Sequence, residues 1–565
     1  MPTPASGVLH ENDRVFCSRA ARGTALIAAD YDLIFSGGRV VDGTGAPWFK
    51  ADVAVKNDKV AAVGDLSAAT AVRRIDAKGL VVAPGFIDMM GQSEYHVLVD
   101  GRAASKITQG ITTEITGEGA SIAPLNARML EESKDLYEHY GVTPNFTTLS
   151  GYFEEFARRG SSINLATFVG AGGVRNLVIG KENRPATAEE MTRMEQLVAQ
   201  AMQEGALGIS TALIYVPDTF ASTEELIALS KVAARYGGSY ITHQRDEGDD
   251  DTVGLDGSMD EFFRIAREAN IPAEIYHIKA AGKANWGRMP AMLKRLEEAR
   301  AQGLDVSADQ YPWTAGSNSL GDGLPLWVRE GGADKMVKRL RDKKTRAKIR
   351  EDFVKANAEW PDLASRILIT RVINPDLRKY QGKTLADIGR EEDKDPLDVM
   401  LDIVADDRGN TYRVTFNMSE EDVRTALCHP LISFSTDSPA MAEDGILSQN
   451  KSHPRAWGSA TRILGHYVRD EKVVPLEEAI RKMTSLPAAR MKLADRGILR
   501  EGMAADLVAF DPATVKERST FADPTHYSEG VPYVAVNGQL VVDGGKITAA
   551  RPGRILKGPG YQGVH

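Results

Sequence analysis

Short apolar runs alternate with stretches of helical period along the middle of the chain. Between about residues 80 and 490, helical stretches such as 187–205 and 260–271 separate the apolar runs. A strand–helix pattern repeated eight times predicts an α/β fold with a (β/α)8 barrel. The eight predicted strands are 85–90, 111–118, 164–172, 205–211, 239–248, 273–282, 305–313 and 431–438.

The two ends of the chain follow a different pattern, in which apolar and polar positions alternate. Residues 31–80 and 491–555 contain short strands of this kind, and Gly-Gly, Asp-Gly and Asn-Asp turn signals separate those of the first segment. We expect both segments to form one small β-sandwich domain, interrupted by the barrel of residues 81–490. Charged helices in residues 314–430 predict an inserted helical subdomain over the mouth of the barrel.

Composition narrows the class of protein. The 565 residues are 42% hydrophobic and 26% charged, with a net charge of −9, which is typical of a soluble globular protein and disfavours a nucleic-acid surface. No apolar run is long enough for a transmembrane helix. Residues 1–30 are interpreted as a loosely held leader, and the two cysteines fit a reducing, cytoplasmic location, with export as the alternative. The oligomeric state stays open, with a homo-oligomer as one option.

Candidate catalytic side chains fall at the carboxyl ends of the predicted strands, where barrel enzymes carry their chemistry. His243 and His277 end the fifth and sixth strands, Asp437 ends the eighth, and Glu118 follows the second. Two imidazoles and a carboxylate suit a three-ligand zinc site, and a second carboxylate can transfer protons. We therefore assign Glu118 as a ligand and Asp437 as the proton shuttle.

Structural roles are the alternative for each of these residues. A histidine at a strand end is often simply hydrogen-bonded, and Glu118 could accept bonds from loop amides. His96, beyond the first strand, is interpreted as structural. The acidic run 246–251 is interpreted as a solvated loop.

The motifs together resemble the amidohydrolase superfamily and, within it, the D-aminoacylase (N-acyl-D-amino-acid deacylase) family. The similarity extends from about residue 31 to about residue 555. Singly, APGFID and GMAADLVAFDP point only to the superfamily, but together with HQRDEG, HIKAAG, YPWTAGS and HPRAWG they are specific for the deacylase branch. The motifs that carry the resemblance are SGGRVVDGTGAPW, APGFID, ITQGITTEITG, EGALGIST, YITHQRDEG, YHIKAAGKANWG, QYPWTAGS, HPRAWG and RGILREGMAADLVAFDP.

The resemblance implies hydrolysis of an N-acyl amino acid to a free amino acid and a carboxylic acid. The expected mechanism is attack of a metal-bound water, with Asp437 as general base and acid. His243 and His277 match tightly held zinc ligands of the family. Lys279, Tyr311 and Arg455 match positions that hold the substrate carboxylate, for which an arginine fork is well suited.

The chain departs from the family at the metal. Met90 and Gln92 stand where the first strand of the family carries His-x-His, and the loop around Glu118 lacks the family's cysteine. Glu118 is the expected replacement, because a carboxylate is a competent zinc ligand. The departures predict one divalent metal ion, with zinc favoured and other metals made more plausible by the oxygen ligand.

Two other functions stay open at this point. The same site could hydrolyse another amide, a lactone or a dipeptide. Alternatively, the chain could be a degenerate barrel that binds a ligand without turnover, since three expected ligand side chains are missing.

Overall fold

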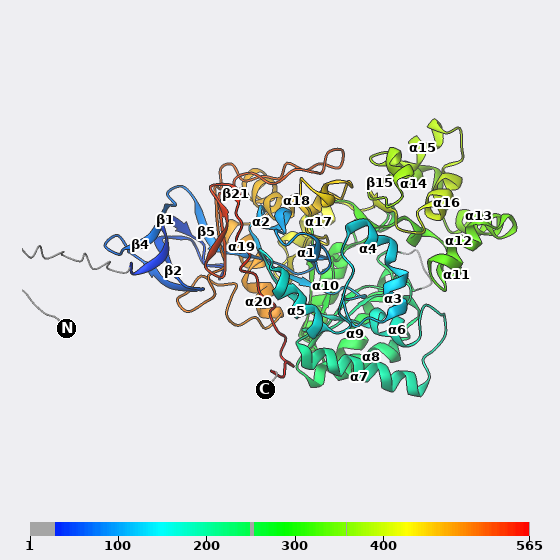
Figure 1. Ribbon diagram of the computed structural model, residues 1–565, viewed down its shortest axis with the longest axis horizontal. Helices are drawn as coiled ribbons and strands as arrows, with labels where there is room; N and C mark the ends of the chain where they lie inside the picture. Colours follow the sequence, from blue (N-terminus) through cyan, green and yellow to red (C-terminus); the bar gives the residue numbers. More distant parts are fainter. Residues whose placement is uncertain (1–28, 249–252, 358, 564–565) are drawn as a thin grey trace, which may run out of the picture.

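The computed structural model describes residues 29–248, 253–357 and 359–563. Except for its last two residues, the predicted leader lies outside this part of the chain. Within the described part, no helix combines the length and the apolar character needed to cross a bilayer. Figure 1 shows a β-sheet region at one end of the molecule, parallel strands and helices in the middle, and a mainly helical region at the other end.

Each of the eight predicted strands overlaps an observed strand, and every observed strand is shorter than predicted. The third is divided into two by Phe168. The strands are β6 (Phe86–Asp88), β7 (Ile111–Thr116), β8 (Asn164–Thr167), β9 (Val169–Gly170), β10 (Gly208–Ala212), β11 (Ser239–His243), β12 (Ala273–Ile275), β13 (Val306–Gln310) and β17 (Ile432–Phe434).

These strands form two parallel sheets, with the orders β6-β7-β8 and β9-β10-β11-β12-β13-β17. The sheets also contact each other at the first and last strands. The Met89 amide beyond β6 donates to the Phe434 carbonyl of β17 over 3.1 Å, and Gly91 forms a parallel bridge with Ser438. Strand order and direction are therefore consistent with the predicted barrel, and the carboxyl ends of the strands lie at one end of the assembly.

Helices between the strands cover the sheets. Of these, α8 packs on β10 and β11, α9 packs on β12, and α10 packs on β13. The helices of this region are α1 (His96–Val99), α2 (Ala104–Ile107), α3 (Ala127–Glu132), α4 (Lys134–Tyr140), α5 (Leu149–Arg159), α6 (Ala171–Val178), α7 (Ala188–Glu204), α8 (Thr223–Arg235), α9 (Gly254–Ala269), α10 (Met289–Ala301), α17 (Glu420–Cys428), α18 (Arg455–Arg462), α19 (Leu476–Met483) and α20 (Ser485–Arg490).

Helix α7 shows how local sequence sets these boundaries. The Thr187 side chain accepts a hydrogen bond from the Glu190 amide, and the Glu190 side chain accepts one from the Thr187 amide, which together form a capping box. The helix ends at Gly205, whose φ of 118° favours glycine. Met194 and Val198, four residues apart, lie on its buried face.

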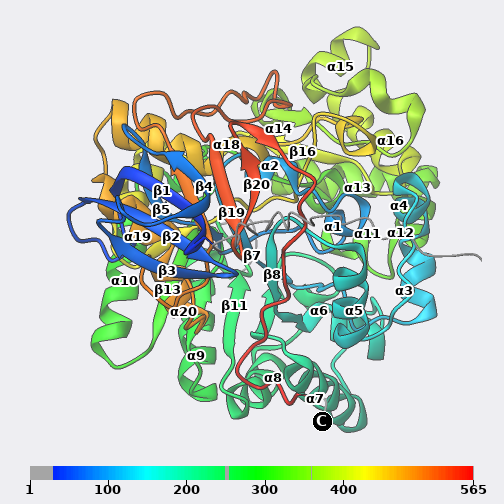
Figure 2. The ribbon, with the colours of Figure 1, turned by 60° about the vertical axis from the view of Figure 1, so that its left-hand side comes forward.

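Both ends of the chain contribute to one nine-stranded sheet, in which β5 pairs with β1 from the N-terminal segment and with β18 from the C-terminal segment. Figure 2 shows the strands of the two segments side by side. The strands are β1 (Tyr31–Val40), β2 (Phe49–Lys56), β3 (Lys59–Gly64), β4 (Ala71–Asp76), β5 (Val81–Pro84), β18 (Leu507–Phe510), β19 (Tyr533–Val536), β20 (Gln539–Asp543) and β21 (Lys546–Ile547).

The segment between β13 and β17 has its own hydrophobic cluster, which includes Leu340, Phe353 and Trp360. It also contains a three-stranded antiparallel sheet that the helical periodicity did not predict. The sheet consists of β14 (Gly316–Ser319), β15 (Ile367–Ile369) and β16 (Tyr412–Thr415), and the helices are α11 (Leu326–Arg329), α12 (Ala333–Arg341), α13 (Lys343–Ala356), α14 (Trp360–Ser365), α15 (Leu385–Glu391) and α16 (Pro396–Asp406).

A fully buried lysine connects the first parallel strands to the last one. The Lys106 ammonium lies 3.0 Å from the Asp88 carboxylate of β6 and 2.6 Å from the Glu114 carboxylate of β7. It also donates to the Thr436 hydroxyl beyond β17 at 2.7 Å. Because water does not reach these groups, the ammonium is needed to compensate the two carboxylates.

Substitution Lys106→Met should destabilise the fold by about 3–5 kcal/mol, because it leaves buried carboxylates uncompensated. Urea denaturation measures the change. The matched control is Lys134→Met, since Lys134 is half exposed and its nearest carboxylate oxygen is 3.6 Å away. A Lys106→Met protein that unfolds at the same urea concentration as Lys134→Met would contradict this role.

Candidate metal-dependent active site

The connection between β5 and β6 places the site. β5 of the nine-stranded sheet leads directly into β6, so the amino ends of the parallel strands face that sheet. Their carboxyl ends face the opposite way, toward the helical region that begins after β13 (Figure 1). The predicted site residues of this region end β11, follow the carboxyl ends of β7, β12, β13 and β17, or begin α18.

Three of the predicted residues form a group with the spacing of metal ligands. Glu118, His243 and His277 each offer a ligand atom, and these atoms lie within 4.8 Å of one another. Glu118 Oε1 is 2.9 Å from His243 Nδ1 and 3.8 Å from His277 Nε2. The two imidazole rings meet edge to face, with centroids 4.5 Å apart.

This geometry fits a tetrahedral metal. Bonds of about 2.0–2.1 Å at the tetrahedral angle place ligand atoms about 3.4 Å apart. The two distances from Glu118 Oε1, 2.9 and 3.8 Å, lie on either side of that value. Two nitrogens and a carboxylate oxygen are also donors that zinc accepts, so the residues present fit a zinc ion.

Glu247 lies on the far side of both histidines from Glu118. Its carboxylate is 3.1 Å from His277 Nδ1 and 3.5 Å from His243 Nε2, and it forms a 2.5 Å ion pair with Lys279. The assignment of residues 246–251 to a solvated loop was therefore wrong for Glu247 and also for Asp246, which is buried, while residues 249–251 lie outside the described part of the chain. A carboxylate behind a ligating histidine fixes the ring and its tautomer.

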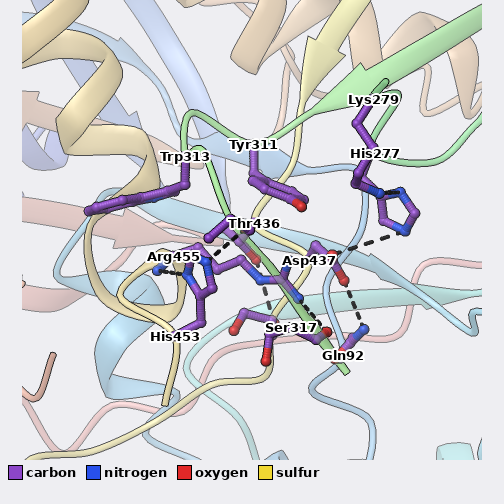
Figure 3. Close-up of polar contacts among 12 residues, drawn as sticks. Gln92, His277, Lys279, Tyr311, Trp313, Ser317, Thr436, Asp437, His453 and Arg455 are labelled. Carbon is purple, nitrogen blue, oxygen red and sulfur yellow. Dashed lines mark hydrogen bonds and ion pairs between the residues drawn. The ribbon is translucent and has the colours of Figure 1, made fainter. Parts of the chain in front are cut away.

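Asp437 lies on the opposite side of the group, and both of its oxygens have partners. Its Oδ2 is 4.0 Å from His277 Nε2 and 2.6 Å from the Arg455 guanidinium. Its Oδ1 accepts a 3.0 Å hydrogen bond from the Gln92 amide, which also donates to Glu118 over 3.1 Å. Figure 3 shows the side chains of Gln92, Arg455 and His277 arranged around Asp437.

Tyr311 lies between the two cations of the site. The Lys279 ammonium is 5.8 Å and the Arg455 guanidinium carbon 4.7 Å from the centre of its ring. Arg455 also donates to the Ser317 carbonyl of β14 over 3.4 Å. The three predicted carboxylate-binding residues therefore lie together, and the inserted region contributes a backbone contact to them (Figure 3).

The backbone is unusual at two of these positions. His277 has a φ of 35° and Asp437 a φ of 50°, a region that residues other than glycine seldom adopt. The Asp309 carboxylate accepts a hydrogen bond from the His277 amide, and the Met90 carbonyl accepts one from the Asp437 amide. Neighbouring strands thus hold both residues in these conformations, and such constraints are common at functional sites.

The pKa values reflect this crowding. Burial and the adjacent ammonium oppose protonation of His277, but the surrounding carboxylates outweigh them and raise its pKa to about 9. Burial also tends to raise the pKa of Glu118, yet bonds and charge from the two histidines lower it overall. Burial raises the pKa of Asp437 despite Arg455, and the charge of Glu118 adds to the rise. The protonation of each acid and base of the site therefore depends on the charges of its neighbours.

The sequence missed two members of the site, Glu247 and Gln92. Glu247 follows His243 by four residues in the same loop, and that spacing was the available signal. Gln92 was recognised only as a poor metal ligand, because its two carboxylate partners come from strands distant in the sequence.

Two histidines and a carboxylate at the carboxyl ends of parallel strands, with a second carboxylate nearby, are typical of metal-dependent hydrolases. The model of the Amidohydrolase family matches residues 73–542. A D-aminoacylase of Alcaligenes xylosoxydans xylosoxydans is 37% identical over 93% of this chain and 97% of its own length. An N-acyl-D-glutamate deacylase of the same organism is 34% identical over 93% and 96%.

Solved structures agree with these relatives. A D-aminoacylase structure, described in terms of a binuclear metal center with one-metal activation and second-metal attenuation, has a TM-score of 0.78 at 37% identity and covers 93% of this chain and 100% of its own. The N-acyl-D-glutamate deacylase of Bordetella bronchiseptica, complexed with zinc and a phosphonate mimic of the tetrahedral intermediate, has a TM-score of 0.78 at 31% identity, covering 93% and 99%. The chain belongs to the amidohydrolase family, in its D-aminoacylase branch.

Substitution Glu118→Ala should abolish retention of a divalent metal, because the two histidines alone provide too few ligands. Elemental analysis after gel filtration measures the content, which we expect to be about one equivalent in the unsubstituted protein.

A second group supplies the matched control. Glu420, His466 and Glu471 also lie close enough to hold a metal, but the guanidinium of Arg424 pairs with both carboxylates, at 3.2 and 2.8 Å. Glu420→Ala should therefore leave the metal content unchanged. Metal that is lost from Glu420→Ala and kept by Glu118→Ala would show that the ligands had been assigned to the wrong group.

Proposed function

We propose that the protein hydrolyses the amide of N-acyl-D-amino acids to a free amino acid and a carboxylic acid in a metal-dependent reaction. The observation that supports this most is the Glu118, His243 and His277 group with the Asp437 carboxylate 4.0 Å from His277. The names of the relatives supply the substrate class, and the D series is assigned by analogy with them.

We propose one metal ion, zinc, held by Glu118, His243 and His277. When bound, such an ion lowers the pKa of a water molecule and polarises a carbonyl oxygen. Two positions beyond β6 argue against a second ion, because the thioether of Met90 is buried in an apolar cluster and the Gln92 amide already faces two carboxylates. A D-aminoacylase with a binuclear center would then differ from this chain in the number of metal ions that it holds.

Asp437 is the proposed acid–base residue. It accepts a proton from the attacking water and passes it to the amide nitrogen as the C–N bond breaks, so that the amine leaves in neutral form. Its position 4.0 Å from the proposed ligand His277 supports this role.

Arg455, Lys279 and Tyr311 are the proposed binding site for the substrate carboxylate. Both cations are paired with acids, Arg455 with Asp437 and Lys279 with Glu247. The substrate carboxylate must therefore share or replace these partners. Binding would in this way turn the Arg455 guanidinium from the catalytic carboxylate toward the substrate.

We further infer that the parallel strands close as a (β/α)8 barrel within residues 81–490. The Met89–Phe434 hydrogen bond and the Gly91–Ser438 bridge support closure between the first and last strands. The nine-stranded sheet supports a second domain from residues 31–80 and 491–555, and the separate hydrophobic cluster supports an insertion within 314–430.

The direct test is a panel of N-acetyl-D- and N-acetyl-L-amino acids, a lactone and a dipeptide, assayed with the zinc-loaded protein. We expect release of the D-amino acids and little or none of the L forms. Turnover of only the lactone or dipeptide would replace the proposed substrate, and no turnover in the panel would favour a ligand-binding role.

Substitution Asp437→Asn should lower kcat by about 10²–10⁴-fold, because the amide cannot accept the proton. Zinc content should stay the same, since Asp437 is not one of the three proposed ligands. Steady-state kinetics and elemental analysis on the same preparation separate the two effects. Full activity in Asp437→Asn would assign the proton transfer to another group.

Substitution Arg455→Lys should reduce the preference for a free substrate carboxylate by roughly tenfold or more, because the bidentate contact is lost. The measurement compares kcat/KM for an N-acyl amino acid with that for its carboxamide. Arg462→Lys is the matched control on the same helix, where Arg462 pairs with Glu517. An unchanged ratio in Arg455→Lys would place the carboxylate elsewhere.

A further inference from the structure

We propose that Gln92 is a positioning residue whose side-chain amide joins the two carboxylates of the site, Glu118 and Asp437, and excludes a second cation from the space between them. This inference rests on the proposed metal-dependent function and deepens it. It gives a specific role to the position that, from the sequence, was recognised only as a lost metal ligand.

The geometry of the amide carries the argument. Gln92 Nε2 is 3.1 Å from Glu118 Oε2 and 3.0 Å from Asp437 Oδ1. A primary amide nitrogen has two hydrogens, so one nitrogen can donate to both carboxylates at once. A cation bound between the same two oxygens would have to displace this nitrogen.

Gln92 is itself held in place next to Asp437. The Gln92 backbone amide donates to the Ser438 carbonyl over 3.2 Å, and Gly91 forms a parallel β-bridge with Ser438. The Asp437 backbone amide in turn donates to the Met90 carbonyl over 2.8 Å. The chain beyond β6 is thus bonded to the loop beyond β17 at Asp437 and at Ser438.

The bond to Glu118 affects the metal. Glu118 Oε2 accepts from Gln92, while Oε1 is the atom that faces His243 at 2.9 Å. The amide therefore determines which oxygen is presented to the ligand group. Hydrogen bonds to a ligating carboxylate commonly change metal affinity, because they fix the orientation of the ligand.

The bond to Asp437 affects proton transfer. Arg455 holds Oδ2, and Gln92 holds Oδ1. If a substrate carboxylate draws Arg455 away, Gln92 still fixes the aspartate. Oδ2 then becomes the oxygen that accepts the proton, and it is also the one nearer to His277, at 4.0 Å.

The test compares Gln92→Met, which removes both N–H groups at similar side-chain length, with Gln92→Glu and the unsubstituted protein. Zinc affinity is measured by competition with a chelator, zinc stoichiometry by titration, and kcat and KM by hydrolysis of an N-acetyl-D-amino acid. Gln381→Met is the control, since Gln381 is a half-buried glutamine of the inserted region that bonds to Asn450. Melting temperatures report whether each variant is folded.

We expect Gln92→Met to lower zinc affinity and kcat by about 10–100-fold each, with KM changed less than threefold. Gln381→Met should change neither zinc affinity nor kcat. The unsubstituted protein should saturate at one zinc, and Gln92→Glu should accept a second, because a third carboxylate replaces the donor.

The inference is overturned if folded Gln92→Met binds zinc and turns over like the unsubstituted protein, or if the latter already takes up two zinc ions. These results differ from a failure of the proposed function. An unsubstituted protein that binds one zinc but hydrolyses no N-acyl amino acid would reject the function, while a loss of zinc affinity in Gln92→Met would still support the role of the amide.

Discussion

The carboxylate of Asp88 is buried between the first and last parallel strands. The position of the loop after β17 depends on the groups that neutralise the charge of this carboxylate. Lys106 supplies the charge, and the backbone amide and hydroxyl of Thr436 donate to the same carboxylate over 2.8 and 2.5 Å. Asp437 follows directly, with its backbone in a strained conformation. The buried ion pair therefore connects the closure of the strands to the placement of the proton-transferring group.

Carboxylates also need positively charged partners at the carboxyl ends of the strands, where three more of them lie close together. Lys279 compensates Glu247, Arg455 compensates Asp437, and the two histidines compensate Glu118. A metal at the ligand group would replace a proton on a histidine by a greater positive charge. Lys279 and Arg455 would then be more available to a substrate carboxylate. Metal binding and substrate binding therefore both depend on how the positive charges neutralise these three carboxylates.

Much of this could be predicted from local sequence. The repeated strand–helix pattern located every strand of the two parallel sheets, and the positions of His243, His277 and Glu118 near strand ends predicted that these residues lie together. Partners across strands could not be predicted in this way. Gln92 meets residues 26 and 345 positions away, and the pairing of Arg455 with Asp437 depends on where α18 packs. The first antiparallel strand of the insertion was hidden because β14, with the sequence Gly-Ser-Asn-Ser, has no apolar alternation.

In this protein, we propose that the Glu118 carboxylate has replaced the sulfur ligand of the family and that one metal ion suffices. X-ray absorption spectroscopy of the zinc-loaded protein tests it most directly. We predict nitrogen and oxygen neighbours at about 2.0–2.1 Å, with the multiple scattering of two imidazoles. A sulfur neighbour at about 2.3 Å, or a second metal at about 3.5–4 Å, would contradict the account.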